Sequence, residues 1–180
     1  MNYIIYDLEA TCWENMPIGY VQETIEIGAY RFNEYGQLRG KFSRFIKPVV
    51  HPVLSLFCRE LTGISQEEIN RADTFPIVIE EFMDWARVDT GDYLLCSWGS
   101  FDRKMLAADC QLHRLDDDWT TLHTNLKEQY RVMHGKRNGM GLKKAVESEG
   151  IVFTGQHHRG ISDAENLAKL FLRYLDRWNL

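Results

Sequence analysis

Four segments of the chain carry the hydrophobic pattern of β-strands. Tyr3–Tyr6 is continuously apolar and rich in β-forming residues, which is typical of a strand buried on both faces. Thr24–Phe32 and Leu38–Pro48 follow as two further strands, and the polar segment Asn33–Gln37 between them favours a hairpin turn. Tyr93–Trp98 is the fourth apolar strand.

Two helices are predicted around this last strand. One begins at Thr74, with Pro76 in its first turn. The other runs from Phe101 to Gln111, directly after Ser100, a residue type that favours helix N-caps. Apolar residues recur at helical spacing in both segments: Val78, Phe82, Trp85, Met105, Leu106 and Cys110.

The second half of the chain reads as helical. Leu142–Glu149 is a short amphipathic helix that Gly150 ends, and the spacing of Ser162 and Glu165 predicts a capping box that opens a final helix. Strands followed by alternating strand and helix predict an α/β fold with a mixed β-sheet flanked by α-helices. In such folds the functional site lies beyond the carboxyl ends of the parallel strands. The apolar stripe of the final helix comprises Leu167, Phe171, Tyr174, Leu175 and Trp178.

Length and charge narrow the functional classes. The 180 residues suffice for one hydrophobic core, and no repeat or linker interrupts them, so we expect a single domain over residues 1–180. Lys and Arg total 21 against 26 Asp and Glu, a net charge of −5. This balance argues against gripping long stretches of nucleic acid by charge alone, but not against an enzyme that contacts only a strand end.

The cysteines and the beginning of the chain indicate the compartment. The chain has four widely spaced cysteines: Cys12, Cys58, Cys96 and Cys110. Their spacing argues against a zinc ribbon or a disulfide scaffold. The sequence begins without a basic leader, and no apolar stretch reaches the roughly 18 residues that a membrane span needs. We therefore expect a cytoplasmic protein with no membrane association and no evident obligate protein partner.

Acidic residues follow the predicted strands. Asp7 and Glu9 lie two residues apart at the end of the first strand, so their side chains project to the same side. Such a pair is costly unless a cation lies between the two charges, although a solvated loop would also tolerate it. Asp102 and Asp163 each fall near a predicted helix start, where the helix dipole alone favours an acid. All four could nevertheless converge.

Two histidines precede Asp163. His158 lies five residues before it, and a histidine beside a metal site can accept a proton near neutral pH. An exposed loop histidine with no role is the alternative. Sequence order does not separate His158 from its neighbour His157.

The order of these residues resembles the three exonuclease motifs of the DEDDh (DnaQ-like) 3′–5′ exonucleases of the RNase T superfamily. The first motif is Tyr6-Asp7-Leu8-Glu9-Ala10-Thr11-Cys12-Trp13. The second is Gly99-Ser100-Phe101-Asp102, and the third is His158-Arg159-Gly160-Ile161-Ser162-Asp163. Asp7–Trp13, Glu23–Ala29 and Leu54–Ile64 are also similar to the ERI-type (KapD-like) exoribonuclease branch.

This resemblance implies an RNase H-like exonuclease fold and a metal-dependent reaction that releases nucleoside 5′-monophosphates from a 3′ end. Two Mg²⁺ ions, with Mn²⁺ as a substitute, fit a set of carboxylates that lacks thiolates. The implied metal ligands are Asp7, Glu9, Asp102 and Asp163. The implied catalytic residues are His158, which deprotonates the attacking water, and Glu9.

The resemblance also implies contacts with the terminal nucleotide. These fall on Leu8, Ala10 and Thr11, and on the pair Phe57 and Leu61, for which core packing on a helix is the alternative. A separate basic segment lies between Lys127 and Lys144. We interpret its Lys136 and Arg137 as a rim that contacts phosphates, although a solvated basic face is common.

Several functions fit these motifs. The expected partner is a single-stranded 3′ end. RNA is the preferred substrate, because the sequence resembles the ERI-type exoribonuclease branch. Single-stranded DNA is the alternative within the same chemistry. A non-catalytic nucleic-acid-binding module and a phosphatase acting on small nucleotides are alternatives from other classes.

Overall fold

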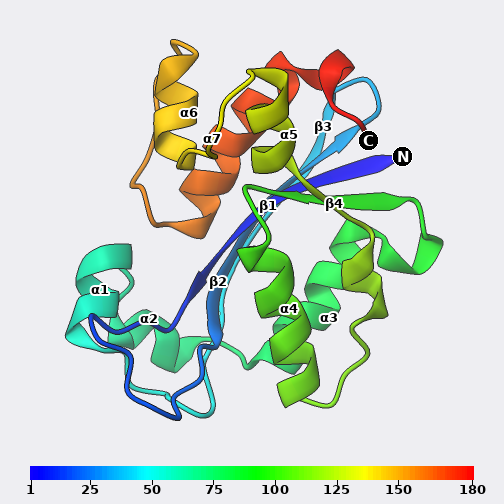
Figure 1. The fold of residues 1–180 in the computed structure, drawn as a ribbon. Coiled ribbons are helices and arrows are strands. Elements are labelled where there is room, and N and C mark those ends of the chain that lie inside the picture. The colour runs from blue at the N-terminus through cyan, green and yellow to red at the C-terminus, as the bar shows by residue number, and fades with distance from the viewer.

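The computed structural model describes residues 1–180 and contains one five-stranded mixed sheet (Figure 1). The strand order is β3-β2-β1-β4-β5. β1 (Asn2–Ala10), β2 (Thr24–Asn33) and β3 (Leu38–Phe45) form an antiparallel meander. β4 (Tyr93–Ser97) and β5 (His123–Asn125) continue the sheet parallel to β1. The predicted mixed sheet is confirmed.

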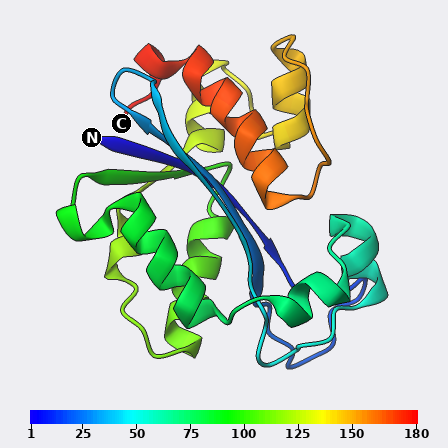
Figure 2. The same ribbon diagram turned by 180° about the vertical axis from the view of Figure 1, so that it is seen from behind.

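Helices cover both faces of this sheet, as the two opposite views show (Figures 1 and 2). α3 (Phe75–Ala86) and α4 (Phe101–Leu112) lie on one face. α5 (Leu126–Met133), α6 (Leu142–Ser148) and α7 (Gly160–Arg173) lie on the other. No helix is long and apolar enough to cross a membrane.

The alternation of side chains along β1 divides the core in two. Ile4, Tyr6 and Leu8 are buried against the α3 and α4 side, whereas Ile5 is buried against α7. Because successive strand residues point to opposite faces, Asp7 and Glu9 continue the row of Ile5. The strand therefore delivers both acids to the face that α7 covers.

Two short helices, α1 (Leu56–Thr62) and α2 (Gln66–Arg71), lie beyond the carboxyl end of β1 (Figure 1). Both begin with a side-chain cap, and Ser65 forms a complete capping box with Glu68. α1, α2, α5 and β5 were not among the elements predicted from the sequence. Three short 3₁₀ helices complete the fold: Val88–Thr90, Asp118–Thr121 and Leu175–Arg177.

The capping box predicted for α7 is wrong, whereas Ser100 takes the predicted N-cap position of α4. α7 begins at Gly160, so Ser162 lies inside its first turn and forms no capping box. Glu165 instead accepts hydrogen bonds from Thr154 Oγ1 (2.7 Å) and the Tyr30 hydroxyl (3.3 Å). Ser100 precedes α4 but its side chain caps nothing.

The remaining helix predictions agree with the structure within a few residues. Pro76 lies in the first turn of α3, and α6 ends two residues before Gly150. α7 ends at Arg173, five residues before Trp178, which is still buried in the same core cluster. The hairpin turn between β2 and β3 is present at the predicted place.

Candidate active site

Three acids meet at the carboxyl end of β1. Asp7 and Glu9 project from the strand, and Asp163 comes from the first turn of α7. Their carboxylate oxygens lie within 4.8 Å of one another. Asp7 is half-buried, Glu9 is 9% exposed and Asp163 is 5% exposed. This cluster therefore has a concentrated negative charge with little access to water.

Asp102 lies beside this cluster, in the first turn of α4. Its Oδ1 accepts a hydrogen bond from the backbone N–H of Leu8 at 3.1 Å. This bond ties α4 to β1 between Asp7 and Glu9. The carboxylate is buried, and its charge acts on that of Asp7. The structure thus brings all four predicted acids to one place, with Asp102 held against the strand backbone.

Burial and mutual repulsion make these carboxylates hard to ionise. Burial raises the pKa of Asp7 well above its ordinary value, and the charges of Asp102, Asp163 and Glu9 raise it further. Burial also raises the pKa of Glu9 to about 9 and that of Asp102 to about 6. A cation placed among them would remove both penalties, because it stabilises the charged forms.

A close backbone contact between β2 and α7 brings Asp163 to the strand. A Cβ atom on Gly28 would lie 2.2 Å from the backbone nitrogen of Ile161, and one on Gly160 would lie 3.0 Å from the carbonyl oxygen of Asp7. Only glycine fits at Gly28, because backbone atoms cannot move aside. The first turn of α7 therefore lies directly against the sheet.

Glu26 holds this turn in place. Its side chain is fully buried and accepts hydrogen bonds from the backbone N–H of Gly160 (3.0 Å) and from Arg159 Nε (3.1 Å). It lies opposite Glu9 across the β1–β2 ladder. Glu26 was not identified from the sequence, although a charged residue within the apolar run of β2 was the available signal.

The two histidines lie on the loop that enters α7. His157 Nδ1 lies 3.0 Å from Asp163 Oδ1, and the backbone N–H of His158 donates to Asp163 Oδ2 at 3.2 Å. The two rings stack at 4.0 Å, and His158 has a left-handed backbone conformation with φ of 65°. Burial and the neighbouring His157 lower the pKa of His158, against the opposing effect of Asp163. A neutral imidazole is the form that can accept a proton.

The nucleotide contacts predicted at the end of β1 are limited to backbone atoms. Leu8 and Ala10 are buried in the core on the face opposite the acids. Thr11 is 2% exposed, and its Oγ1 accepts a hydrogen bond from the backbone N–H of Glu23 at 2.9 Å. A ligand at the acidic cluster can therefore meet these three residues through main-chain atoms only.

Phe57 and Leu61 both lie on α1, at the i and i+4 positions of one helix face. Phe57 is 38% exposed and Leu61 is half-buried, so the aromatic ring remains accessible. Cys58 of the same helix contacts the carbonyl oxygen of Ala10 (3.7 Å), which holds α1 at the end of β1. Phe101, an exposed aromatic next to Asp102, was not identified from the sequence.

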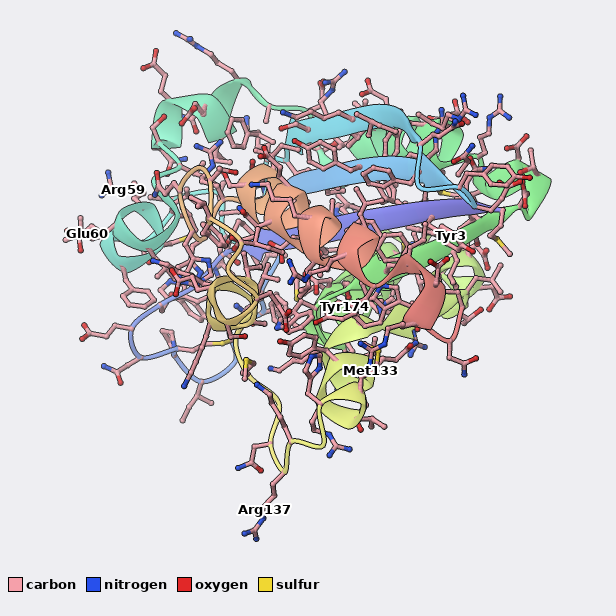
Figure 3. The ribbon with its side chains drawn as sticks, turned by 90° about the horizontal axis from the view of Figure 1, so that it is seen from above. Tyr3, Arg59, Glu60, Met133, Arg137 and Tyr174 are labelled. Atoms are coloured by element: carbon pink, nitrogen blue, oxygen red, sulfur yellow. The ribbon has the colours of Figure 1, made fainter.

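The basic residues chosen from the sequence lie on the segment between α5 and α6. Lys136 folds back over the ring of Tyr130, with its Nζ 5.7 Å from the ring centroid. Arg137 is exposed and projects outward from the body of the molecule (Figure 3). Neither residue lies in the acidic cluster.

The acidic cluster offers carboxylate oxygens as metal ligands. The histidine loop adds imidazole nitrogens beside them. Carboxylate oxygens suit hard divalent cations. The four acids therefore form a candidate divalent-metal site with two histidines beside it.

Comparison with known proteins identifies the class of this chain. The model of the RNase T family, described as exonuclease, matches residues 4–171. The chain belongs to this exonuclease family. It is also similar to the solved nuclease domain of 3'hExo, described as a DEDDh family member bound to rAMP. That structure is 32% identical with a TM-score of 0.89, and the match covers 97% of this chain and 92% of that one.

Two curated relatives are named exoribonucleases. The human 3'-5' exoribonuclease 1 is 34% identical, over 95% of this chain and 51% of its own length. The Xenopus laevis ERI1 exoribonuclease 2 is 29% identical, over 96% of this chain and 28% of its own length. This chain thus spans about half the length of the human relative. The predicted family and the RNase H-like exonuclease fold are confirmed.

Proposed function

We propose that this protein is a metal-dependent 3′–5′ exonuclease that releases nucleoside 5′-monophosphates, with RNA as its preferred substrate. The convergence of Asp7, Glu9 and Asp163 within 4.8 Å, with Asp102 beside them, is the observation that carries the proposal. The relatives named exoribonucleases and the rAMP-bound nuclease domain support the choice of RNA. The acting unit in this proposal is a single domain over residues 1–180.

Asp7, Glu9, Asp102 and Asp163 would hold two divalent ions, Mg²⁺ or Mn²⁺ rather than zinc, because the acids are hard oxygen donors. When bound, such ions activate water and neutralise the phosphate oxygens. Glu9 orients the attacking water from the end of β1, and His158 accepts its proton. The lowered pKa of His158 supports this role, because it favours the neutral ring, which can accept a proton.

The terminal nucleotide would lie between the end of β1 and α1. The backbone of Leu8, Ala10 and Thr11 would contact its sugar, and the exposed face of Phe57 would stack on a base with Leu61 behind it. Stacking on an aromatic ring contributes about 1–3 kcal/mol per base and tolerates any sequence. This arrangement suits an enzyme that removes each nucleotide in turn.

Lys136 and Arg137 would contact phosphates farther along the strand. The substrate in this proposal is the single-stranded 3′ end of an RNA. We place the protein in the cytoplasm, because all four cysteines are free, as a reducing compartment would keep them.

The direct test uses matched RNA and DNA oligonucleotides labelled at the 5′ end, incubated with Mg²⁺, Mn²⁺ or EDTA. The proposal predicts a ladder that shortens from the 3′ end, requires the metal, releases 5′-monophosphates and forms faster on RNA. A faster DNA ladder would keep the site and overturn the substrate. No cleavage of either strand would overturn the enzyme itself.

A further inference from the structure

A hollow of about 440 Å³ lies between α6 and the segment that leads into α7. We call it the α6 hollow. Its lining residues come from α6 on one side and from the segment between Gly150 and His157 on the other. The residues that matter below are Lys143, Glu147, Phe153 and His157.

His157 links the α6 hollow to the acidic cluster. This histidine lines the hollow, and its Nδ1 lies 3.0 Å from Asp163 Oδ1. The His157 ring also meets the ring of Phe153 edge-on, with the centroids 5.4 Å apart. A ligand that extends from the site toward α6 would therefore pass directly from the acids to an aromatic wall.

The same loop contacts α1 on its other side. A Cβ atom on Gly63, the residue that ends α1, would lie 2.6 Å from the side-chain nitrogen of Gln156, so the two are in tight contact. The loop thus connects α1, where the terminal nucleotide is proposed to bind, with the α6 hollow. A strand cleaved beside His158 would have its 3′ nucleotide on the α1 side and its 5′ portion on the α6 side.

The wall of the α6 hollow contains one lysine, Lys143. Lys143 is exposed, and its Nζ lies 6.0 Å from the Phe153 ring centroid. Glu149, which follows α6, is already paired with Arg173. Glu147 is the one acid in the wall. An ammonium beside an accessible aromatic ring matches the two parts of a nucleotide, its phosphate and its base.

We propose that the α6 hollow binds the 5′ portion of a single-stranded nucleic acid, beyond the two nucleotides that flank the scissile bond. Phe153 stacks on a base of that portion, and Lys143 pairs with its phosphate. The inference rests on the proposed exonuclease function for the direction of the strand. It assigns to Lys143 and Phe153 a role in binding longer substrates, with no part in the bond cleavage.

The test compares a dinucleotide with a decanucleotide of the same RNA sequence. Lys143→Gln and Phe153→Leu should raise the KM of the decanucleotide by about fivefold or more, because a base is no longer stacked or a phosphate no longer neutralised. They should leave kcat, and the KM of the dinucleotide, unchanged. Lys41→Gln is the matched control, because Lys41 of β3 has a similar contact with the ring of Tyr30 of β2 (5.6 Å).

Binding of the labelled decanucleotide, measured by fluorescence anisotropy, separates this inference from the proposed function. Weaker binding in both variants, with an unchanged melting temperature, would support the α6 hollow even in a protein that cleaves nothing. Binding equal to that of the unmodified protein would overturn the inference. So would equal losses on the dinucleotide and the decanucleotide, since these would place the two residues at the terminal nucleotide.

Discussion

Two sets of buried carboxylates in this molecule have opposite surroundings. Glu23, Glu26 and Asp109 are each satisfied by backbone N–H groups, for example by those of Val49 (2.6 Å), Gly160 (3.0 Å) and Thr24 (2.9 Å). These hydrogen bonds stabilise the charged carboxylates. Each acid also joins two segments that are distant in the sequence. These are structural carboxylates.

Asp7 and Glu9 have the other kind of surroundings. Burial and neighbouring acids raise the pKa of both. Asp163 has only the histidine loop as its partner. Such crowding destabilises the fold unless a cation is bound, so it is expected at functional sites. The difference teaches that missing hydrogen-bond donors, more than burial, distinguish Asp7 and Glu9 from the structural acids.

Removing one crowded acid should produce the largest effect. Asp7→Asn should lower turnover by about three orders of magnitude or more, because the metal site loses a ligand. Without metal, the same change should raise the free energy of unfolding by about 1 kcal/mol, because it removes a repelled charge. Activity assays and denaturant titration in EDTA check both. A variant that is inactive and also less stable would break the comparison.

The two histidines should differ in the next largest effect. His158→Ala should lower kcat by about 10²- to 10⁴-fold, the usual contribution of a general base. His157→Ala should cost only about tenfold, since the ring of His157 orients Asp163. Measured kcat values for the two variants decide the assignment. The reverse ranking would identify His157 as the base.

Breaking the structural pair Glu26–Arg159 should cost stability. Arg159→Met should lower the free energy of unfolding by about 3 kcal/mol, because Glu26 remains buried with fewer partners. Arg44→Met is a close control, since Arg44 Nε lies the same 3.1 Å from Glu81 at an exposed site. Its cost should stay below about 1 kcal/mol. Equal losses in denaturant titration would mean that burial of the pair is irrelevant.

The metal-free protein should lose stability as the pH rises. The pKa of Glu9 is about 9 when folded against 4.5 ordinarily, so the folded protein retains a proton that the unfolded chain releases. The free energy of unfolding in EDTA should therefore fall by at least about 1 kcal/mol between pH 5 and about 8. A saturating divalent ion should remove most of this fall. A metal-free profile that rises over this interval would contradict the raised pKa.

The smallest effect is expected at the exposed basic segment. Neutralising Lys136 and Arg137 should weaken nucleic-acid binding across sequences and reduce the slope of log K against log salt by roughly 0.7 for each phosphate that the protein no longer neutralises. The slope comes from anisotropy titrations at several salt concentrations. An unchanged slope would show that the segment is only a solvated face.

Much of the site could be predicted because it is encoded locally. The apolar start of β1, the spacing of Asp7 and Glu9, and the acids in the first turns of α4 and α7 are all visible in the sequence. Strand periodicity then places both β1 acids on one face. Short helices such as α2 and α5 lack enough periodic positions for the same inference.

The start of α7 could not be predicted, because its cap comes from another strand. The carboxylate of Glu26 accepts the N–H of Gly160 and so replaces the local cap that Ser162 was expected to provide. The same tertiary contact accounts for Gly28, whose missing side chain leaves room for the helix. Local sequence rules do not contain such long-range partners.

Metal binding tests the central claim most directly. Mn²⁺ should be titrated calorimetrically into the unmodified protein, Asp163→Asn and Asp109→Asn, after each has been shown to fold. The account predicts that Asp163→Asn abolishes binding, whereas Asp109→Asn keeps it, because Asp109 is occupied by the N–H of Thr24. Undiminished binding in Asp163→Asn would contradict the claim that the crowded carboxylates form the metal site.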